Sequence, residues 1–402
     1  MERRTVYALA GIGGAVALSA LLFGRAPQAS ASAPRVPTDP NEVLETLAFG
    51  SASSDPKSRE ATALRAELAK NPRDLDLATK LAKLDIQLSR ERSDPRYLGH
   101  AQAALAPWWA MEDAPVEVLV LRATIEQSLH DFEAALRDLD RAVKVRPDHP
   151  QAWLTRAVVL TVRGRYDDAR VSCDRLARMT TPLVATVCRT SIDSVTGKAK
   201  QAYEELGRVL EQGGRVSEDE EAWARGSLGE YAQRANDLDA AEKHFRRTLQ
   251  LDPDDSYVRA ALADLLIDRG RFADAIEIVK GREANDGHLL RLALAEKKNG
   301  SKEAEAHIET LRARFEASRL RGDVVHRREE ARFRLDLEGD AQKALDLAKD
   351  NWDVQKEPWD VRVLLEAARA AKSPAAAKPA LDWIGRHGLE DPFIAKVAEA
   401  LR

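Results

Sequence analysis

Residues 150–183 read PQAWLTRAVVLTVRGRYDDARVSCDRLARMTTPL, and this segment carries the clearest sign of the architecture. Apolar residues recur every three or four positions on both sides of Gly164, which is the spacing of two amphipathic helices joined by a tight turn. Two small residues, Ala157 and Ala169, stand twelve positions apart, one in each expected helix. Helices approach closely only where the facing residues are small. The segment therefore predicts a helical hairpin that crosses at these two alanines.

The same pair of small residues recurs along the chain. The first-helix positions are Ala123, Ala157, Thr190, Gly229, Ala263 and Ala293, with spacings of 34, 33, 39, 34 and 30 residues. The second-helix positions are Ala135, Ala169, Ala202, Ala241 and Ala275, each twelve residues after its partner. One hairpin alone leaves an apolar face uncovered, so a repeat of this length predicts hairpins stacked into an array.

This pattern resembles the tetratricopeptide repeat (TPR) family, with the strongest motifs in residues 116–182 and 222–280. The resemblance implies an all-α fold: a right-handed α-solenoid of about eight or nine TPR-like hairpins over residues 61–392. Residues 393–402 are expected to form a capping helix. His130 stands in the turn position where such repeats usually carry glycine.

The N-terminus has the layout of a secretory signal. Arg3 and Arg4 precede residues 6–23, which carry no charge, and Ala29–Ala33 offers small residues for cleavage. Residues 1–33 are therefore expected to be a signal peptide or a membrane anchor, and both alternatives stay open. The repeats would lie outside the cytoplasm, periplasmic or anchored to the inner membrane through residues 6–23. Residues 34–60 are expected to be a flexible tether with one short helix.

The composition excludes several other classes of protein. Of 402 residues, 32% are charged and only 5% are aromatic, which suits a helical core of Ala, Leu and Val better than an all-β fold. The net charge of −4 argues against a nucleic-acid partner, since such proteins usually present a basic face.

The sequence contains no recognisable catalytic or cofactor motif. G-x-S-x-G, a Walker loop, CxxC and H-E-x-x-H are all missing, and the eight histidines are dispersed. We therefore expect no enzyme activity, no cofactor and no metal.

Arginine replaces the usual leucine at one position of three successive units, at Arg122, Arg156 and Arg189. A buried guanidinium needs a carboxylate or several carbonyls, and Asp138 on the second helix is placed to pair with Arg122. The alternative is an arginine ladder that binds a small anionic ligand.

The resemblance also implies a concave groove along the first helices. The candidate partner-binding residues are Val120, Thr124, Gln127, Gln151, Leu154, Val158, Thr161, Trp223 and Tyr257. Their mixture of apolar and hydrogen-bonding side chains suits a protein or peptide segment, although these residues could also merely pack between units. The predicted function is a non-catalytic interaction scaffold or adaptor in the cell envelope, and the alternative is a permanent accessory subunit of an envelope complex.

Cys173 and Cys188 are the two cysteines of the chain. In an oxidising compartment they could form a disulfide. The alternative is a pair of buried thiols that pack as small hydrophobic groups.

Overall fold

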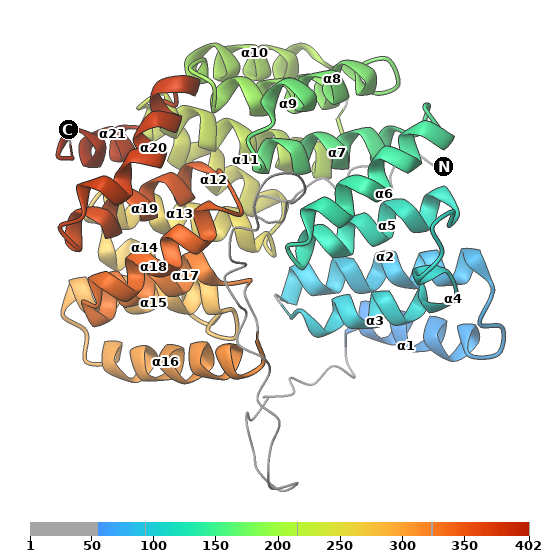
Figure 1. Ribbon diagram of the computed structural model, residues 1–402, viewed down its shortest axis with the longest axis horizontal. Helices are drawn as coiled ribbons and strands as arrows, with labels where there is room; N and C mark the ends of the chain where they lie inside the picture. Colours follow the sequence, from blue (N-terminus) through green and yellow to red (C-terminus); the bar gives the residue numbers. More distant parts are fainter. Residues whose placement is uncertain (1–54, 93, 215, 323–324, 402) are drawn as a thin grey trace, which may run out of the picture.

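The computed structural model describes residues 55–92, 94–214, 216–322 and 325–401, which form helices and turns without a strand. Nine helical hairpins follow one another around a curved array (Figure 1). They are α2 (Leu75–Arg92) with α3 (Arg96–Ala104), α5 (Val116–Ser128) with α6 (Phe132–Val145), α7 (Pro150–Val162) with α8 (Tyr166–Leu176), α9 (Pro182–Ser194) with α10 (Ala199–Gln212), α11 (Glu218–Arg234) with α12 (Leu238–Leu251), α13 (Ser256–Asp268) with α14 (Phe272–Val279), α15 (Asp286–Asn299) with α16 (Ala304–Leu320), α17 (Arg327–Arg332) and the π-helix η2 (Phe333–Glu338) with α18 (Ala341–Trp352), and α19 (Pro358–Ala370) with α20 (Pro374–His387).

Three helices lie outside the hairpins: α1 (Pro56–Leu68), α4 (Ala106–Trp109) and α21 (Pro392–Glu399). The prediction of an all-α solenoid with eight or nine hairpins is confirmed, and α21 occupies the place expected for a capping helix. Residues 56–60, which were expected to belong to the tether at 34–60, form the beginning of α1 instead. This helix begins at Pro56, and Asp55 is its N-cap. The Asp55 carboxylate accepts a hydrogen bond from the Ser58 amide at 2.9 Å, which caps the helix. The expected signal or anchor and the short helix of the tether lie outside the described residues.

Small residues stand where the helices of each hairpin cross. Ala123, Ala135, Ala157 and Ala169 are each at most 2% exposed. At the equivalent position of α11, a Cβ added to Gly229 would overlap the ring of Phe245 on α12. The repeat of small residues thus sets the distance between the two helices of a hairpin, as the sequence predicts.

The turns inside the hairpins use the left-handed backbone conformation. Gly164 has φ +70°, and His130 adopts φ +74° at the matching turn of the preceding hairpin. The next helix then begins under a side-chain cap where the sequence offers one: the Asp131 carboxylate accepts a hydrogen bond from the Ala134 amide at 3.0 Å.

Enlarging a crossing residue should destabilise the array. We expect Ala157→Leu to lower the free energy of unfolding by about 1–3 kcal/mol, because the added atoms have no space between α7 and α8. The control is Ala306→Leu on the exposed face of α16, where no such cost is expected. Equal urea midpoints for the two variants would show that Ala157 does not lie at a helix crossing.

The array curves so far that its last helices return to its middle. In Figure 1, α17–α20 run in front of α11–α15, and α20 reaches the neighbourhood of α10. One hydrophobic core cluster joins residues of α2–α9 to residues of α18–α21. The C-terminal helices therefore pack against hairpins that precede them by about 200 residues.

Candidate functional site

The nine predicted partner-binding residues do not lie on one open surface. Five of them, on α5 and α7, are at most 5% exposed: Val120, Thr124, Gln127, Gln151 and Leu154. Four remain accessible: Val158 and Thr161 on α7, Trp223 on α11, and Tyr257 on α13, which is 38% exposed. A partner that approaches the folded chain can reach only this second group.

Two polar residues of the buried group, Thr124 and Gln151, donate hydrogen bonds within their own helices, whereas Nε2 and Oε1 of Gln127 have no hydrogen-bond partner among the described residues. The Thr124 hydroxyl donates to the Val120 carbonyl at 2.8 Å, and the Gln151 amide donates to the Thr155 hydroxyl at 3.0 Å. Hydrogen bonds of this kind hold a side chain against its own helix. Thr124 and Gln151 therefore have the side-chain chemistry of ligand-binding residues, but their hydrogen bonds are made inside the folded chain.

The arginine series forms a repeated structural pair within each hairpin. Arg122 donates from Nε and Nη2 to the carboxylate of Asp138, sixteen residues later, and from Nη1 to the carbonyl of Met111 at 3.0 Å. Arg156 donates to Ser172, also sixteen residues later, at 2.7 Å, and Arg189 pairs with Glu205 at the same spacing. Each guanidinium therefore joins its first helix to its second. The structure contains the predicted Arg122–Asp138 pair, and the series does not form an open anion site.

A pocket of about 270 Å³ lies beside the Arg122–Asp138 pair, between the α4–α5 loop and the helices α5 and α6. Glu126 lines it, and its Oε2 atom is buried without a hydrogen-bond partner among the described residues. Burial, assisted by the negative charge of Asp138, raises the pKa of Glu126 to about 8.

This raised pKa gives a stability prediction with a defined sign. The unfolded chain titrates near 4.5, so the contribution of Glu126 to stability is complete below pH 4.5 and is lost as the pH rises towards 8. We expect Glu126→Gln to be more stable than the parent by about 1–2 kcal/mol at pH 9 and by much less at pH 5, with partial solvent exposure limiting the gain. Urea titrations at both pH values measure the difference. An advantage that is independent of pH would contradict the assignment.

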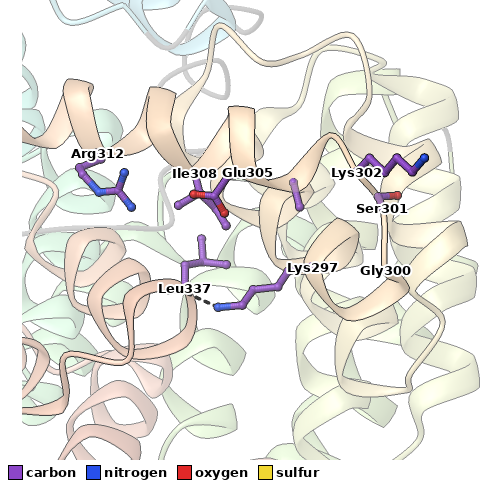
Figure 2. A pocket seen from close by; sticks show the side chains of 9 residues that line it. Lys297, Gly300, Ser301, Lys302, Glu305, Ile308, Arg312 and Leu337 are labelled. Carbon is purple, nitrogen blue, oxygen red and sulfur yellow. Dashed lines mark hydrogen bonds between the residues drawn. The ribbon is translucent and has the colours of Figure 1, made fainter.

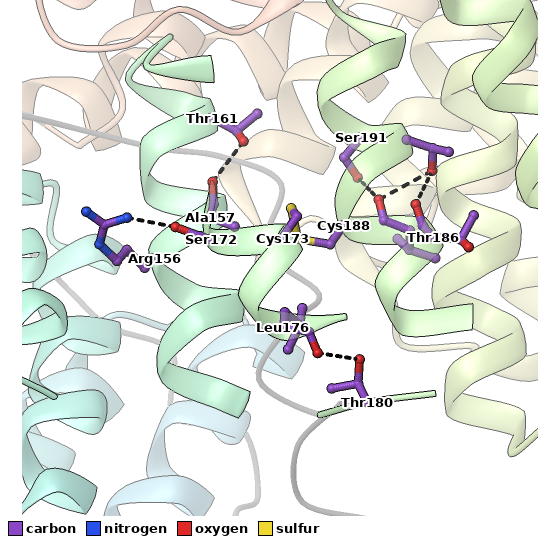
Figure 3. The surroundings of a disulfide bond; sticks show 12 residues. Arg156, Ala157, Thr161, Ser172, Cys173, Leu176, Thr180, Thr186, Cys188 and Ser191 are labelled. Carbon is purple, nitrogen blue, oxygen red and sulfur yellow. Dashed lines mark hydrogen bonds between the residues drawn. A yellow bond between two sulfur atoms is a disulfide. The ribbon is translucent and has the colours of Figure 1, made fainter. Parts of the chain in front are cut away.

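The structure joins Cys173 on α8 to Cys188 on α9 through a disulfide (Figure 3). Both cysteines are buried, at 2% and 6% exposure. Of the two alternatives left open by the sequence, the structure adopts the bonded one. The bond links the second helix of one hairpin to the first helix of the next, so it fixes two successive hairpins relative to each other.

The turns inside five consecutive hairpins, residues 129–131, 163–165, 195–198, 235–237 and 269–271, are here called the turn edge. Residues 354–399, comprising the α18–α19 loop and α19–α21, are called the closing segment. The closing segment contacts the turn edge and the helix ends beside it at several hairpins. No local sequence pattern indicates this surface.

The first contact lies at the end of α7. Arg163 donates from Nη1 to the Val354 carbonyl at 2.6 Å, and the Lys356 amide donates to the Val162 carbonyl at 2.9 Å. Val162 is the last residue of α7, so its carbonyl has no acceptor role inside the helix. The closing segment therefore satisfies a polar group that the helix end would otherwise present to water.

The second contact is aromatic and depends on a glycine. The Trp383 ring on α20 lies 5.7 Å from the Tyr166 ring, measured between centroids, and His387 lies 5.0 Å from Tyr166. A Cβ added to Gly164 would overlap the Trp383 indole. Only a residue without a side chain allows α20 to approach the turn this closely.

In the third contact, a residue that is distant in the sequence caps the N-terminus of α10. The Lys198 side chain forms no cap for α10, and the Ala199 amide instead donates to Oε2 of Glu390 at 3.1 Å. Beside it, a Cβ on Gly197 would lie 3.2 Å from the Gly388 carbonyl oxygen. A carboxylate at a helix N-terminus is favoured by the free amides and the helix dipole.

The fourth contact is a bidentate ion pair. Arg362 on α19 donates from Nη1 and Nη2 to the two carboxylate oxygens of Asp268, at 2.6 and 2.7 Å. The Arg362 guanidinium also lies 4.5 Å from the centroid of the Trp359 ring. Arg362 thus connects the last hairpin to the end of α13, and these four contacts together close the array on itself.

Asp264 organises a second group of charges one turn earlier on α13. Arg291 of α15 donates to its Oδ2 at 2.7 Å, and Arg332 of α17 donates to its Oδ1 at 2.9 Å. The three side chains are buried, with Asp264 only 3% exposed. Burial alone would raise the pKa of Asp264, but the two guanidiniums outweigh it and hold this pKa below its usual value.

Another hollow, of about 290 Å³, lies between α15, α16 and η2 (Figure 2). Two of its three basic side chains are engaged by other groups of the chain: Lys297 donates to the Leu337 carbonyl at 2.7 Å, and Arg312 donates to Glu338 at 2.8 Å. We therefore assign no ligand to it.

Within the part of the chain that the structure describes, no cluster of three His, Cys, Asp or Glu side chains is arranged to hold a metal ion. Over the same residues, no helix is long and apolar enough to cross a bilayer.

Comparison with known proteins agrees with the hairpin architecture. Two family models described as tetratricopeptide repeat match residues 120–182 and 232–297. No curated protein matches the chain.

The solved structures that are similar to this chain include the following three. The APC/C hetero-tetramer Cut9–Hcn1 shares 14% identity at a TM-score of 0.43, covering 86% of this chain and 74% of that one. A tetratricopeptide repeat protein from Parabacteroides merdae shares 17% at 0.39, covering 60% and 96%. The human IFIT1 dimer with PPP-AAAA shares 13% at 0.46, covering 82% and 78%.

Proposed function

Because the chain is a tetratricopeptide repeat protein, we propose that it is a non-catalytic protein–protein interaction scaffold that binds a segment of a partner along its first helices. The observation that carries the proposal is the repeat itself: hairpins of this family stack into arrays that present long surfaces to other proteins. The partner would contact the accessible group on α7, α11 and α13, namely Val158, Thr161, Trp223 and Tyr257. Apolar and hydrogen-bonding side chains in alternation suit an extended or helical peptide.

We further propose that the protein works outside the cytoplasm, periplasmic or anchored to the inner membrane. The support is the signal-like sequence of residues 1–33, together with the Cys173–Cys188 disulfide, since such bonds persist in oxidising compartments. Cell fractionation of the tagged chain tests this location. Recovery in the cytoplasmic fraction with free thiols would contradict it.

Two alternatives rank lower. A permanent accessory subunit would be expected to expose a continuous apolar patch, whereas Met111, Leu129, Val145, Val171 and Tyr257 are exposed on five separate segments of the described chain. A receptor for a small anion would need free guanidiniums, whereas Arg122, Arg156 and Arg189 are paired within their hairpins.

A pull-down from the native host tests the scaffold proposal. The test variant is Val158→Glu with Thr161→Glu, which places two charges on the accessible side of α7. The control is Val171→Glu on α8 of the same hairpin, because Val171 is 54% exposed and lies on the second helix. We expect the control to retain a near-stoichiometric partner and the double variant to lose it. Equal capture by both variants would place the binding surface elsewhere, and capture of no partner by the parent would overturn the proposal.

A further inference from the structure

The turn edge at the α7/α8 and α9/α10 hairpins has the features of a binding site. It combines a turn glycine, Gly164, and the aromatic ring of Tyr166 two residues later with a helix N-terminus whose Ala199 amide has no cap from its own hairpin. The disulfide fixes these two hairpins relative to each other, which keeps both features in register. A site made of rigid parts at fixed separation can recognise one arrangement of ligand groups.

The chain itself shows which ligand fits this site. The occupant is the end of α20, in which Trp383 is followed five residues later by Gly388 and two residues after that by Glu390. The indole lies over Gly164, the Gly388 backbone approaches Gly197, and the Glu390 carboxylate accepts from the Ala199 amide. A helix that ends with an aromatic residue, a glycine and a carboxylate at this spacing, W-x4-G-x-E, therefore meets every feature of the site.

We propose that this part of the turn edge is a recognition surface for a helix end of that chemistry, and that the closing segment is an internal ligand that a partner helix displaces. The inference rests on the proposed scaffold function and names a second surface together with the kind of partner segment it takes. The internal ligand shields the surface until a partner presents the same groups.

Displacement is physically reasonable because the internal ligand belongs to the terminal hairpin. An internal hairpin of a solenoid stacks on a full hairpin on each side, whereas α19 packs against α18 on one side and meets only the short helix α21 on the other. Terminal elements of this kind open locally at lower free energy than the rest of a fold. Both Gly388 and Glu390 are exposed, so the carboxylate contact exchanges readily with water.

Binding of a synthetic peptide to the full chain tests the inference. The probe is a fluorescently labelled peptide of residues 374–391, followed by anisotropy. We expect it to bind the Trp383→Ala variant at least tenfold more tightly than the parent, because the parent site is filled. Adding Gly164→Ala should weaken that binding at least tenfold, because the new methyl group occupies the place of the indole. Gly270→Ala should leave it unchanged, because φ at Gly270 is +72° and no heavy atom lies within 4 Å of its added Cβ.

A second variant keeps the test valid if Trp383→Ala perturbs folding. Glu390→Ala removes an exposed carboxylate and should open the same site, and circular dichroism confirms that each variant is folded. Peptide binding that exceeds the parent in neither folded variant, or that is insensitive to Gly164→Ala, overturns the inference. The scaffold proposal is judged separately by the α7 pull-down, so a captured partner combined with a failed peptide experiment rejects only the recognition surface.

Discussion

Replacing Asp264 with alanine is expected to lower the free energy of unfolding by about 3–5 kcal/mol. Asp264 is the shared acceptor of Arg291 and Arg332, at 2.7 and 2.9 Å, and all three side chains are buried. Removing the carboxylate takes away the acceptor that both buried guanidiniums share, and breaking a buried ion pair from one side costs this amount. The loss should fall on α13, α15 and α17 together, because one residue connects all three helices.

Urea denaturation measures this loss against a matched control. Asp239 also accepts from an arginine, Arg269 at 2.7 Å, but its side chain is 87% exposed. Exposed pairs contribute about 0–1 kcal/mol, so Asp239→Ala should change the midpoint little. Similar midpoints for the two variants would show that the Asp264 group does not hold the inner helices together.

Removing the disulfide is expected to cost about 3 kcal/mol. The bond closes a loop of fifteen residues, and a loop of this length restricts the unfolded chain by about that free energy. The variant is Cys173→Ala with Cys188→Ala, which keeps small apolar side chains at both buried positions. Denaturation of the parent with dithiothreitol should reproduce the loss, and the same reagent should not shift the midpoint of the double variant.

Thiol labelling provides the control for this prediction. Both cysteines are buried, so labelling is performed on unfolded protein that has not been reduced. A bonded pair gives no labelled thiol, whereas two labelled thiols per chain, or a parent midpoint that does not respond to dithiothreitol, would contradict the assignment.

Local regularities made much of the fold predictable. The twelve-residue interval between small residues encodes a helix crossing, because only small side chains permit the approach, and the structure places Ala157 and Ala169 at such a crossing. His130 was recognisable as a turn residue from its place in the repeat, and it adopts the left-handed conformation. The Arg122–Asp138 pair was accessible for the same reason: both residues belong to one hairpin.

The closure of the array was not predictable from the same patterns. It depends on contacts between residues about 90–220 positions apart, such as Asp268 with Arg362, Ala199 with Glu390 and Tyr166 with Trp383. Which distant hairpins meet is set by the accumulated curvature of all intervening units, and a small change per unit moves the end of the array far. The stacking of α7 against neighbouring helices buries Leu154, which a single repeat would leave at a groove. A periodic pattern describes each unit but not the sum of their rotations.

Hydrogen exchange of the whole chain tests the closed array most directly. The comparison is Gly164→Ala with Gly270→Ala, two turns with φ of +70° and +72°, so the backbone strain of the substitution is alike. Only at Gly164 does the added methyl group meet Trp383. If the array closes as described, amides of α19–α21 exchange at least tenfold faster in Gly164→Ala and remain as slow as in the parent in Gly270→Ala. Equal exchange of these helices in the two variants would contradict the closure of the array by its C-terminal segment.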